Sequence, residues 1–162
     1  MEAFEAIRTL LAVRSYKDTP VPDDVAGRLT GSGMNRQPWH FIVIRERETL
    51  RRLGALASSG SYVAQAPLAI VVATDRSRFA VSDASRAIQS MLLAGWADGV
   101  GSNWVGFGGL ESARALLDIP ASLDVLAILP FGYPARAVGR GNKQRKPLRD
   151  VAHLEKYGRR FE

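Results

Sequence analysis

A polar loop sequence, Ser32-Gly33-Met34-Asn35-Arg36-Gln37-Pro38-Trp39, runs directly into the apolar stretch His40-Phe41-Ile42-Val43-Ile44. The apolar stretch predicts a buried strand. Pro38 lacks an amide donor and favours an extended backbone at Gln37. Hydroxyl and amide side chains at the mouth of a core strand suit a ligand that needs hydrogen bonds but no strong acid or base. The stretch therefore predicts binding of a heteroaromatic cofactor rather than hydrolysis.

Outward from this loop, hydrophobic periodicity predicts a mixture of helices and strands. The helix expected at 82–97 is apolar on more than one face, so we expect it to be central and buried. The strand–helix alternations are too few for a doubly wound sheet, which predicts a single α+β domain over residues 1–162. The other expected elements are helices at 3–11, 46–56 and 110–117, strands at 67–74 and 124–129, and a Gly-rich strand and loop at 99–108.

Composition narrows the functional classes. The chain has 162 residues, of which 46% are hydrophobic, and this is enough for one compact core. It has no cysteine, which excludes disulfides, thiolate catalysis and cysteine metal sites, and its two histidines lie far apart in sequence, so we expect no metal. No apolar run reaches the roughly 18 residues of a membrane span. The start of the chain is unlike a signal peptide, so we expect a cytoplasmic protein without a membrane partner.

The net charge of +6 is concentrated near the C-terminus. Residues 136–162 hold nine of the 22 Lys and Arg but only three of the 16 Asp and Glu. Such a basic segment attracts nucleic acid, a membrane surface or a small phosphorylated ligand. Within it, Lys143-Gln144-Arg145-Lys146 is either a solvated basic run or a phosphate clamp.

Common catalytic motifs are missing. Gly31-Ser32-Gly33 is not followed by the Gly-Lys-Ser/Thr of a P-loop, and Gly106-Phe107-Gly108-Gly109 lacks the spacing of a dinucleotide fingerprint. Ser32 has no nucleophile elbow around it, which favours a turn hydroxyl. His40 lies in an apolar strand, which favours a packed or hydrogen-bonded core histidine over a base. We therefore predict no catalytic side chain.

Several segments occur together in the order found in one family. They are Arg14-Ser15-Tyr16, Pro20-Val21-Pro22, the loop 32–41, Gly99-Val100-Gly101-Ser102-Asn103-Trp104, Leu129-Pro130-Phe131-Gly132-Tyr133-Pro134 and Arg145-Lys146-Pro147-Leu148. Over nearly its whole length the chain resembles the FMN-dependent nitroreductase family. The resemblance implies an α+β sandwich with a mostly antiparallel central sheet flanked by helices. It also implies an intertwined homodimer with FMN at the interface, in contact with both subunits.

The resemblance also implies a site. Matched position by position, Arg14 lies beside the pyrimidine edge of the flavin. The loop that contacts the ribityl chain and ring contains Ser32, Asn35 and Gln37, the backbone amides near flavin N5 and O4 belong to Gly106 and Phe107, and the phosphate lies on Lys143 and Arg145. The implied activity is NAD(P)H-dependent reduction of a nitroaromatic, quinone or related small aromatic acceptor by a ping-pong hydride mechanism, without nucleic acid. The cofactor carries the chemistry, which accounts for the missing catalytic motifs.

Two departures from the family pattern keep alternatives open. Leu10, Leu11 and Ala12 stand where the family usually has an Arg pair and a Ser, so phosphate binding must depend on Lys143 and Arg145. The helix expected between Pro22 and Ser32 is shorter than the ordinary length of about 11 residues. The alternatives are a flavin-site protein with fragmenting, dehalogenating or deazaflavin-linked chemistry, and a basic nucleic-acid or partner-binding module without cofactor chemistry.

Overall fold

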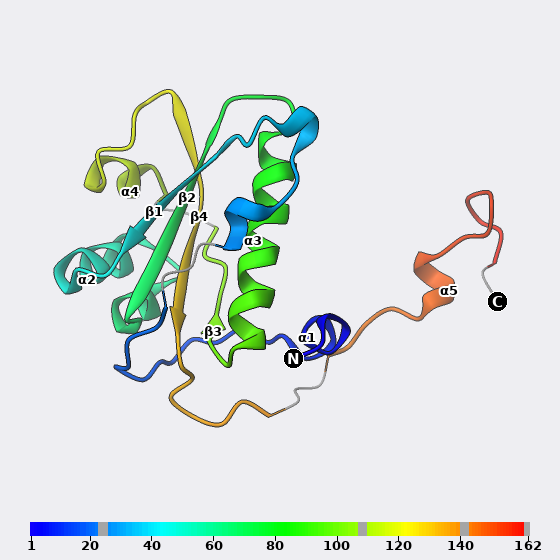
Figure 1. Cartoon of the computed structure of the whole chain (residues 1–162), viewed down its shortest axis with the longest axis horizontal. Helices are drawn as coiled ribbons and strands as arrows, with labels where there is room; N and C mark the ends of the chain where they lie inside the picture. Colours follow the sequence, from blue (N-terminus) through cyan, green and yellow to red (C-terminus); the bar gives the residue numbers. More distant parts are fainter. Residues whose placement is uncertain (23–25, 107–109, 140–142, 161–162) are drawn as a thin grey trace.

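A four-stranded antiparallel sheet forms the centre of the fold in the computed structural model, which describes residues 1–22, 26–106, 110–139 and 143–160 (Figure 1). The strands lie in the order β1-β2-β4-β3, and each neighbouring pair is antiparallel. The prediction of an α+β fold with a mostly antiparallel sheet is confirmed. The strands are β1 (Trp39–Ile44), β2 (Leu68–Asp75), β3 (Gly101–Ser102) and β4 (Leu123–Gly132).

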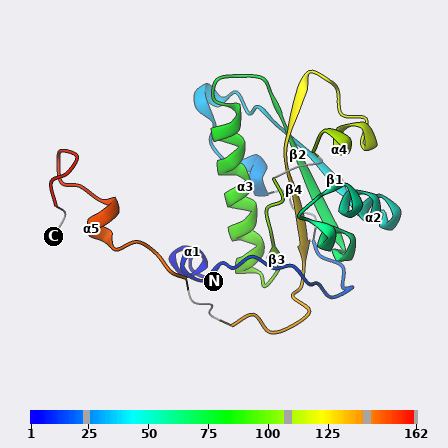
Figure 2. The same cartoon turned by 180° about the vertical axis from the view of Figure 1, so that it is seen from behind.

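Helices cover both faces of the sheet. One face carries α3 (Ala80–Ala97), with α1 (Ala3–Thr9) beside its end, and the other carries α2 (Arg47–Leu56) and α4 (Leu110–Leu116) (Figures 1 and 2). Successive side chains of β2 point to opposite faces. Leu68 and Ile70 therefore join the core cluster under α3, whereas Ala69 and Val71 join the cluster under α2 and α4. The helices predicted at 3–11, 46–56, 82–97 and 110–117 are confirmed, with ends shifted by a few residues.

The segment before the polar loop is as short as its sequence indicates. It forms one 3₁₀ turn, η1 (Ala26–Leu29), which packs on α3. The prediction that this helix is central and buried holds for part of α3 only. Ala87, Ile88 and Met91 are buried, but the last turn, from Leu93 to Ala97, is only half-buried.

Gly27 sets how closely η1 approaches α3. A Cβ built at Gly27 would lie 3.0 Å from Met91 Cγ and 3.1 Å from the Ala87 carbonyl oxygen. We expect Gly27→Ala to lower the free energy of unfolding by about 1–3 kcal/mol, because the turn must shift away from the helix. Gly31→Ala is the matched control, since a Cβ there meets nothing within 4 Å. Urea denaturation of both variants measures the difference, and equal stabilities would contradict this packing.

The strand at 40–44 forms as predicted but is less buried than predicted. β1 is at an edge of the sheet and, among the described residues, pairs with β2 alone, so its middle residues are partly exposed. His40 is therefore not a core histidine: half of its side chain is exposed, and its Nε2 lies 3.2 Å from Asp75 Oδ1. The extended backbone predicted at Gln37 is also wrong, because its φ is 49°.

A proline interrupts the sheet on the β3 side. β3 and the later bridge between Val105 and Ile128 share one register along β4, and this register places Asn103 opposite Pro130. Val105 and Ile128 exchange both of their backbone hydrogen bonds, so the next hydrogen-bonded pair of the ladder needs an N–H from residue 130. Proline has none. The ladder therefore breaks, and Asn103 and Trp104 leave the sheet.

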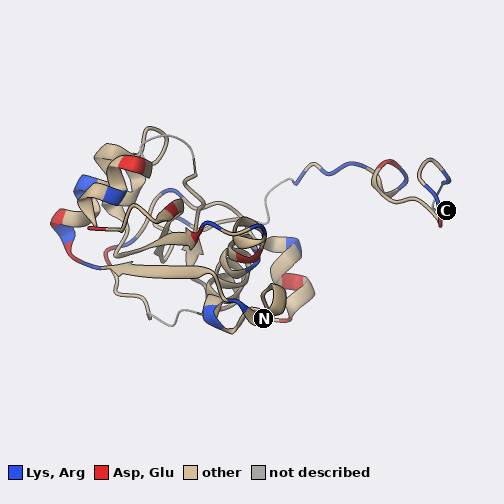
Figure 3. Ribbon diagram, turned by 90° about the horizontal axis from the view of Figure 1, so that it is seen from above, with Lys and Arg blue, Asp and Glu red and all other residues tan. Residues whose placement is uncertain are grey.

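The C-terminal segment, residues 143–160, extends away from the sheet and its helices (Figures 1 and 2). We call it the arm; it contains the short helix α5 (Leu148–Val151). Its apolar side chains, Leu148, Val151, Leu154 and Tyr157, are exposed, and Tyr157 is 93% exposed. Basic residues outnumber acidic ones along the arm, where Asp150 and Glu155 are the acids (Figure 3). Within the described ranges, no helix has the length and hydropathy needed to cross a membrane.

Candidate functional site

The polar loop at 32–37 has an unusual backbone. Met34, Asn35 and Gln37 have φ values of 52°, 53° and 49°, a region in which each non-glycine residue costs about 1–3 kcal/mol. Two hydrogen bonds within the loop stabilise this conformation. The Gln37 amide donates to Ser32 Oγ at 2.8 Å, and Gln37 Nε2 donates to Asn35 Oδ1 at 3.2 Å. Ser32 thus acts as a turn hydroxyl, and all three side chains that the resemblance assigns to the loop lie together.

Asp83 anchors this loop to the first turn of α3. Its carboxylate accepts a hydrogen bond from the Gly33 amide at 3.0 Å and pairs with Arg86. Asp83 is only 2% exposed, although it is charged. Sequence reasoning missed it. The available signal was an acid in the first turn of a largely apolar helix, three residues before an arginine.

We expect Asp83→Ala to destabilise the fold by about 2 kcal/mol, the typical contribution of a hydrogen bond to a charged group. The loop should lose its anchor at the same time, so ligand binding at Asn35 and Gln37 should weaken. Asp83→Asn is the control, because an amide oxygen still accepts from Gly33. Thermal unfolding and ligand titration of both variants check this. Equal losses in the two variants would point to the charge, not the hydrogen bond, as the anchor.

A second group of residues surrounds Arg14. The Val13 amide donates to the Ser102 carbonyl at 2.9 Å, which fixes the backbone next to Arg14. The Arg14 guanidinium carbon lies 6.0 Å from the centre of the Tyr62 ring, a cation–π arrangement. Among the described residues the Arg14 guanidinium has no ion pair and no hydrogen bond. A cation in this state is available to an anionic or electron-rich ligand.

Gly106 joins this group through its neighbours. Asn103 Nδ2 donates to the Tyr62 hydroxyl at 2.6 Å, and Asn103 Oδ1 accepts from the Trp104 amide at 2.9 Å. A Cβ at Gly106 would lie 2.7 Å from Trp104 Nε1, so the indole lies directly against the glycine backbone. The Gly106 amide has no acceptor within the described ranges. Phe107, the other predicted contact, lies outside them.

A buried tyrosine stabilises the same end of the site. The Tyr16 hydroxyl donates to the Val13 carbonyl at 2.6 Å. Burial, and next the neighbouring Tyr62, raise the pKa of Tyr16 above its ordinary value. The phenol therefore keeps its proton at neutral pH and acts as a structural donor rather than a base.

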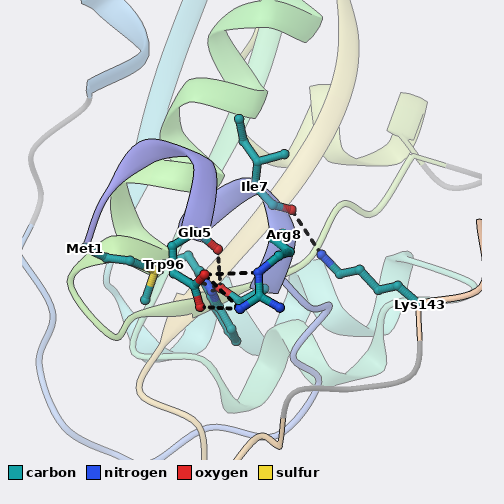
Figure 4. A network of polar contacts seen from close by, with 7 residues as sticks. Met1, Glu5, Ile7, Arg8, Trp96 and Lys143 are labelled. Carbon is teal, nitrogen blue, oxygen red and sulfur yellow. Dashed lines mark hydrogen bonds and ion pairs between the residues drawn. The ribbon is translucent and has the colours of Figure 1, made fainter. Parts of the chain in front are cut away.

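The predicted phosphate residues lie at the start of the arm. Lys143 Nζ donates to the Ile7 carbonyl of α1 at 3.1 Å, beside the ion pair of Glu5 with Arg8 (Figure 4). Arg145 donates to the Gln144 carbonyl at 2.9 Å. Neither cation pairs with a carboxylate in the described part of the chain, so both keep donors for an anion.

One chain does not bring all of these residues together. The loop at 32–37 is tied to Asp83 in the first turn of α3, whereas Val13 and Tyr62 pack with Trp96 in its last turn. α1 is also at that end, since Trp96 Nε1 donates to Thr9 Oγ1 at 2.9 Å. Thirteen residues of α-helix span about 20 Å. The site therefore consists of a loop group and an Arg14 group at opposite ends of one helix.

Comparisons with known proteins agree with this fold. A sequence model described as the Nitroreductase family matches residues 8–72 and 57–133. A protein of Methanothermobacter thermautotrophicus, provisionally named NADH dehydrogenase/NAD(P)H nitroreductase, is 35% identical over 97% of this chain and 88% of its own length. A provisionally named counterpart from Archaeoglobus fulgidus is 34% identical over 82% of this chain and 86% of its own length.

Solved structures give the same result. A crystal structure from Bacteroides thetaiotaomicron with the same provisional name superposes with a TM-score of 0.86 and 29% identity, over 96% of this chain and 98% of that one. An FMN-dependent nitroreductase of Clostridium difficile has a TM-score of 0.86 and 24% identity, over 95% and 99% of the two chains, and shows the fold alone. Because the family model spans most of the sequence and the archaeal homologue is 35% identical over 97% of it, the chain belongs to the nitroreductase family of oxidoreductases.

Proposed function

We propose that the protein is an FMN-dependent oxidoreductase that uses NAD(P)H to reduce nitroaromatic, quinone or related small aromatic acceptors, with residues 1–162 as a single FMN-binding domain in the cytoplasm. FMN, when bound, accepts a hydride from NAD(P)H and passes two electrons on to the second substrate. For a quinone, the two electrons and one proton come from NAD(P)H, and the second proton comes from solvent. Family membership and the names of the relatives support this proposal.

The observation that carries the proposal is the Arg14 guanidinium, which has no ion pair or hydrogen bond within the described ranges and lies over the Tyr62 ring. Tyr62 is linked through Asn103 and Trp104 to Gly106, whose amide has no acceptor within the same ranges. A fixed cation stabilises negative charge that develops on a reduced ring, and a backbone N–H orients the ring by a hydrogen bond. In the loop, Asn35 and Gln37 supply amide groups that bind hydroxyl and carbonyl oxygens. These donors fit the ring and ribityl chain of FMN, and none of them needs to act as an acid or base.

Lys143 and Arg145 would hold the phosphate. An arginine fork and a lysine point charge are the usual partners of phosphate oxygens. The Lys143 ammonium donates one N–H to the Ile7 carbonyl and has two further N–H donors. Since Leu10, Leu11 and Ala12 offer no donor side chains for a phosphate, these two arm residues would carry most of its binding.

A homodimer with FMN at the interface follows from the separation of the two groups. The loop group and the Arg14 group lie about 20 Å apart along α3, so one chain alone does not close around the ligand. The half-buried last turn of α3 and the exposed apolar side chains of the arm offer surface for a second copy. In a twofold dimer, the loop of one copy would meet the Arg14 group of the other.

Absorbance spectroscopy tests this function. We expect the protein, titrated with FMN, to turn yellow, to bleach with NAD(P)H under anaerobic conditions and to regain its colour when a quinone is added. Arg14→Gln, which keeps the size but removes the charge, should weaken FMN binding. Double-reciprocal rate plots should be parallel, as in ping-pong kinetics. A protein that stays colourless in excess FMN would overturn the proposal, and destroyed flavin after aerobic reduction would favour fragmenting chemistry.

A further inference from the structure

We propose that the Trp104 indole is a stacking surface for flat aromatic acceptors, and that Tyr62 and Asn103 hold it in place. This subsite rests on the function proposed above and names the side chain that selects among the acceptors. Trp104 is 37% exposed, whereas Trp39 is buried and Trp96 is half-buried. An exposed indole beside the Gly106 amide is a contact surface that neither the core nor the helices use.

Two features of the backbone place the Trp104 indole beside Gly106. Pro130 breaks the β3–β4 ladder, which releases Asn103 and Trp104 from the sheet. Gly106 then lets the indole lie flush against the chain, because any Cβ there would come within 2.7 Å of Trp104 Nε1. Both features place the Nε1 edge of the indole against the glycine whose amide we assign to the flavin.

Asn103 fixes the direction of the tryptophan. It is only 9% exposed, and both ends of its side-chain amide are used: Nδ2 donates to the Tyr62 hydroxyl, and Oδ1 accepts from the Trp104 amide. A buried amide with both ends engaged holds one orientation. The Arg14 guanidinium in turn lies over the ring of Tyr62. Tyr62 and Asn103 are thus positioning residues that couple the indole to the cation.

The chemistry of this surface selects its ligand. Aromatic rings stack on an indole in an offset arrangement, and such pairs contribute about a factor of ten in affinity beyond simple apolar contact. Saturated ligands and small inorganic oxidants gain nothing from the π-face. The subsite therefore favours planar acceptors such as quinones and nitroaromatics.

Steady-state kinetics with two oxidants tests the subsite. In Trp104→Leu we expect the KM for 1,4-naphthoquinone to rise about tenfold, whereas kcat and the rate with ferricyanide stay close to wild type. Trp104→Phe should recover most of the loss, because it restores an aromatic face. Phe4→Leu is the matched control, since it removes an exposed aromatic side chain from α1, outside the Arg14 group. An unchanged naphthoquinone KM in Trp104→Leu would overturn the proposal.

A binding measurement separates this subsite from the flavin site. FMN is titrated first, and a protein that does not bind it fails the proposed function itself. The FMN-loaded protein is then titrated with 2-naphthol, which should quench tryptophan fluorescence in wild type and in Phe4→Leu but bind about ten times more weakly to Trp104→Leu. Decahydro-2-naphthol has the same carbon skeleton without a π-face and should bind weakly to all three. Equal binding of the two alcohols to wild type would overturn the stacking surface alone.

Tyr62→Phe tests the positioning role. It removes the hydroxyl that accepts from Asn103 but keeps the ring under Arg14, so the FMN affinity should stay unchanged while the naphthoquinone KM rises several-fold. Asn103→Ala should act in the same direction. If Tyr62→Phe leaves the naphthoquinone KM at the wild-type value, Tyr62 does not position Trp104.

Discussion

We expect two defective variants to restore flavin binding when they are refolded together. One carries Arg14→Gln, and the other carries Asn35→Ala and Gln37→Ala. About a quarter of the flavin sites in the mixture should be intact, although neither variant forms an intact site alone. The two lesions lie in different groups at opposite ends of α3. In a twofold dimer that joins the loop of one copy to the Arg14 group of the other, a mixed dimer has one fully intact site and one doubly damaged site. Random pairing places half of the chains in mixed dimers.

Flavin absorbance per chain after gel filtration measures this recovery. The matched control pairs Arg14→Gln with Gly106→Val, because both changes fall in the Arg14 group and no mixed dimer then holds an intact site. No recovery in the first mixture, or the same recovery in the control, would contradict a site shared between two copies.

Removal of the arm is expected to have the second large effect. A chain that ends at Gly139 loses Lys143 and Arg145, and two charge-assisted hydrogen bonds together are worth at least about a 100-fold change in affinity. It also loses the exposed apolar side chains from Leu148 to Tyr157, which are available to a second copy. We therefore expect a monomer that binds FMN at least about 100 times more weakly. Sedimentation and FMN titration measure the two effects.

The fold of the rest of the chain should survive this truncation, since the described contact of the arm with α1 is the hydrogen bond from Lys143 to Ile7. The melting temperature of the monomer supplies that check. The full-length Lys143→Ala, Arg145→Ala variant separates the effect of the two cations on FMN binding from the effect of the arm on dimer formation. It should lose FMN affinity but remain a dimer. A truncated chain that stays dimeric and binds FMN normally would refute both roles of the arm.

Periodicity in the sequence was sufficient to predict the long elements. α2 and α3 repeat their apolar residues at helical spacing, and β2 is a continuous apolar run, so each falls where its pattern indicates. The ends of β4 were harder. A proline usually ends a strand, but β4 continues through Pro130 because β2 pairs with it on the other side. That pairing depends on residues about sixty positions away, which local patterns do not report.

The residues of the candidate site likewise divide into those that the sequence predicts and those that it does not. The loop residues Ser32, Asn35 and Gln37 were accessible from the sequence because they are adjacent in it. Asp83 and Tyr62 were not, because their partners are 50 and 41 residues away. Sequence reasoning also placed His40 in the core, since a strand pattern does not distinguish an edge from a centre. Whether FMN contacts the assigned residues stays a prediction.

The outer edge of β1 has a consequence for handling the protein. Within the described ranges no strand pairs with that edge, and its sequence, Trp-His-Phe-Ile-Val-Ile, has neither an acidic residue nor a lysine, arginine or proline. Unpaired apolar edges of this kind recruit strands from other molecules and seed aggregates. Concentrated or partly unfolded samples should therefore precipitate through this segment. A lysine in place of Val43, whose side chain is already exposed, is a direct way to improve solubility.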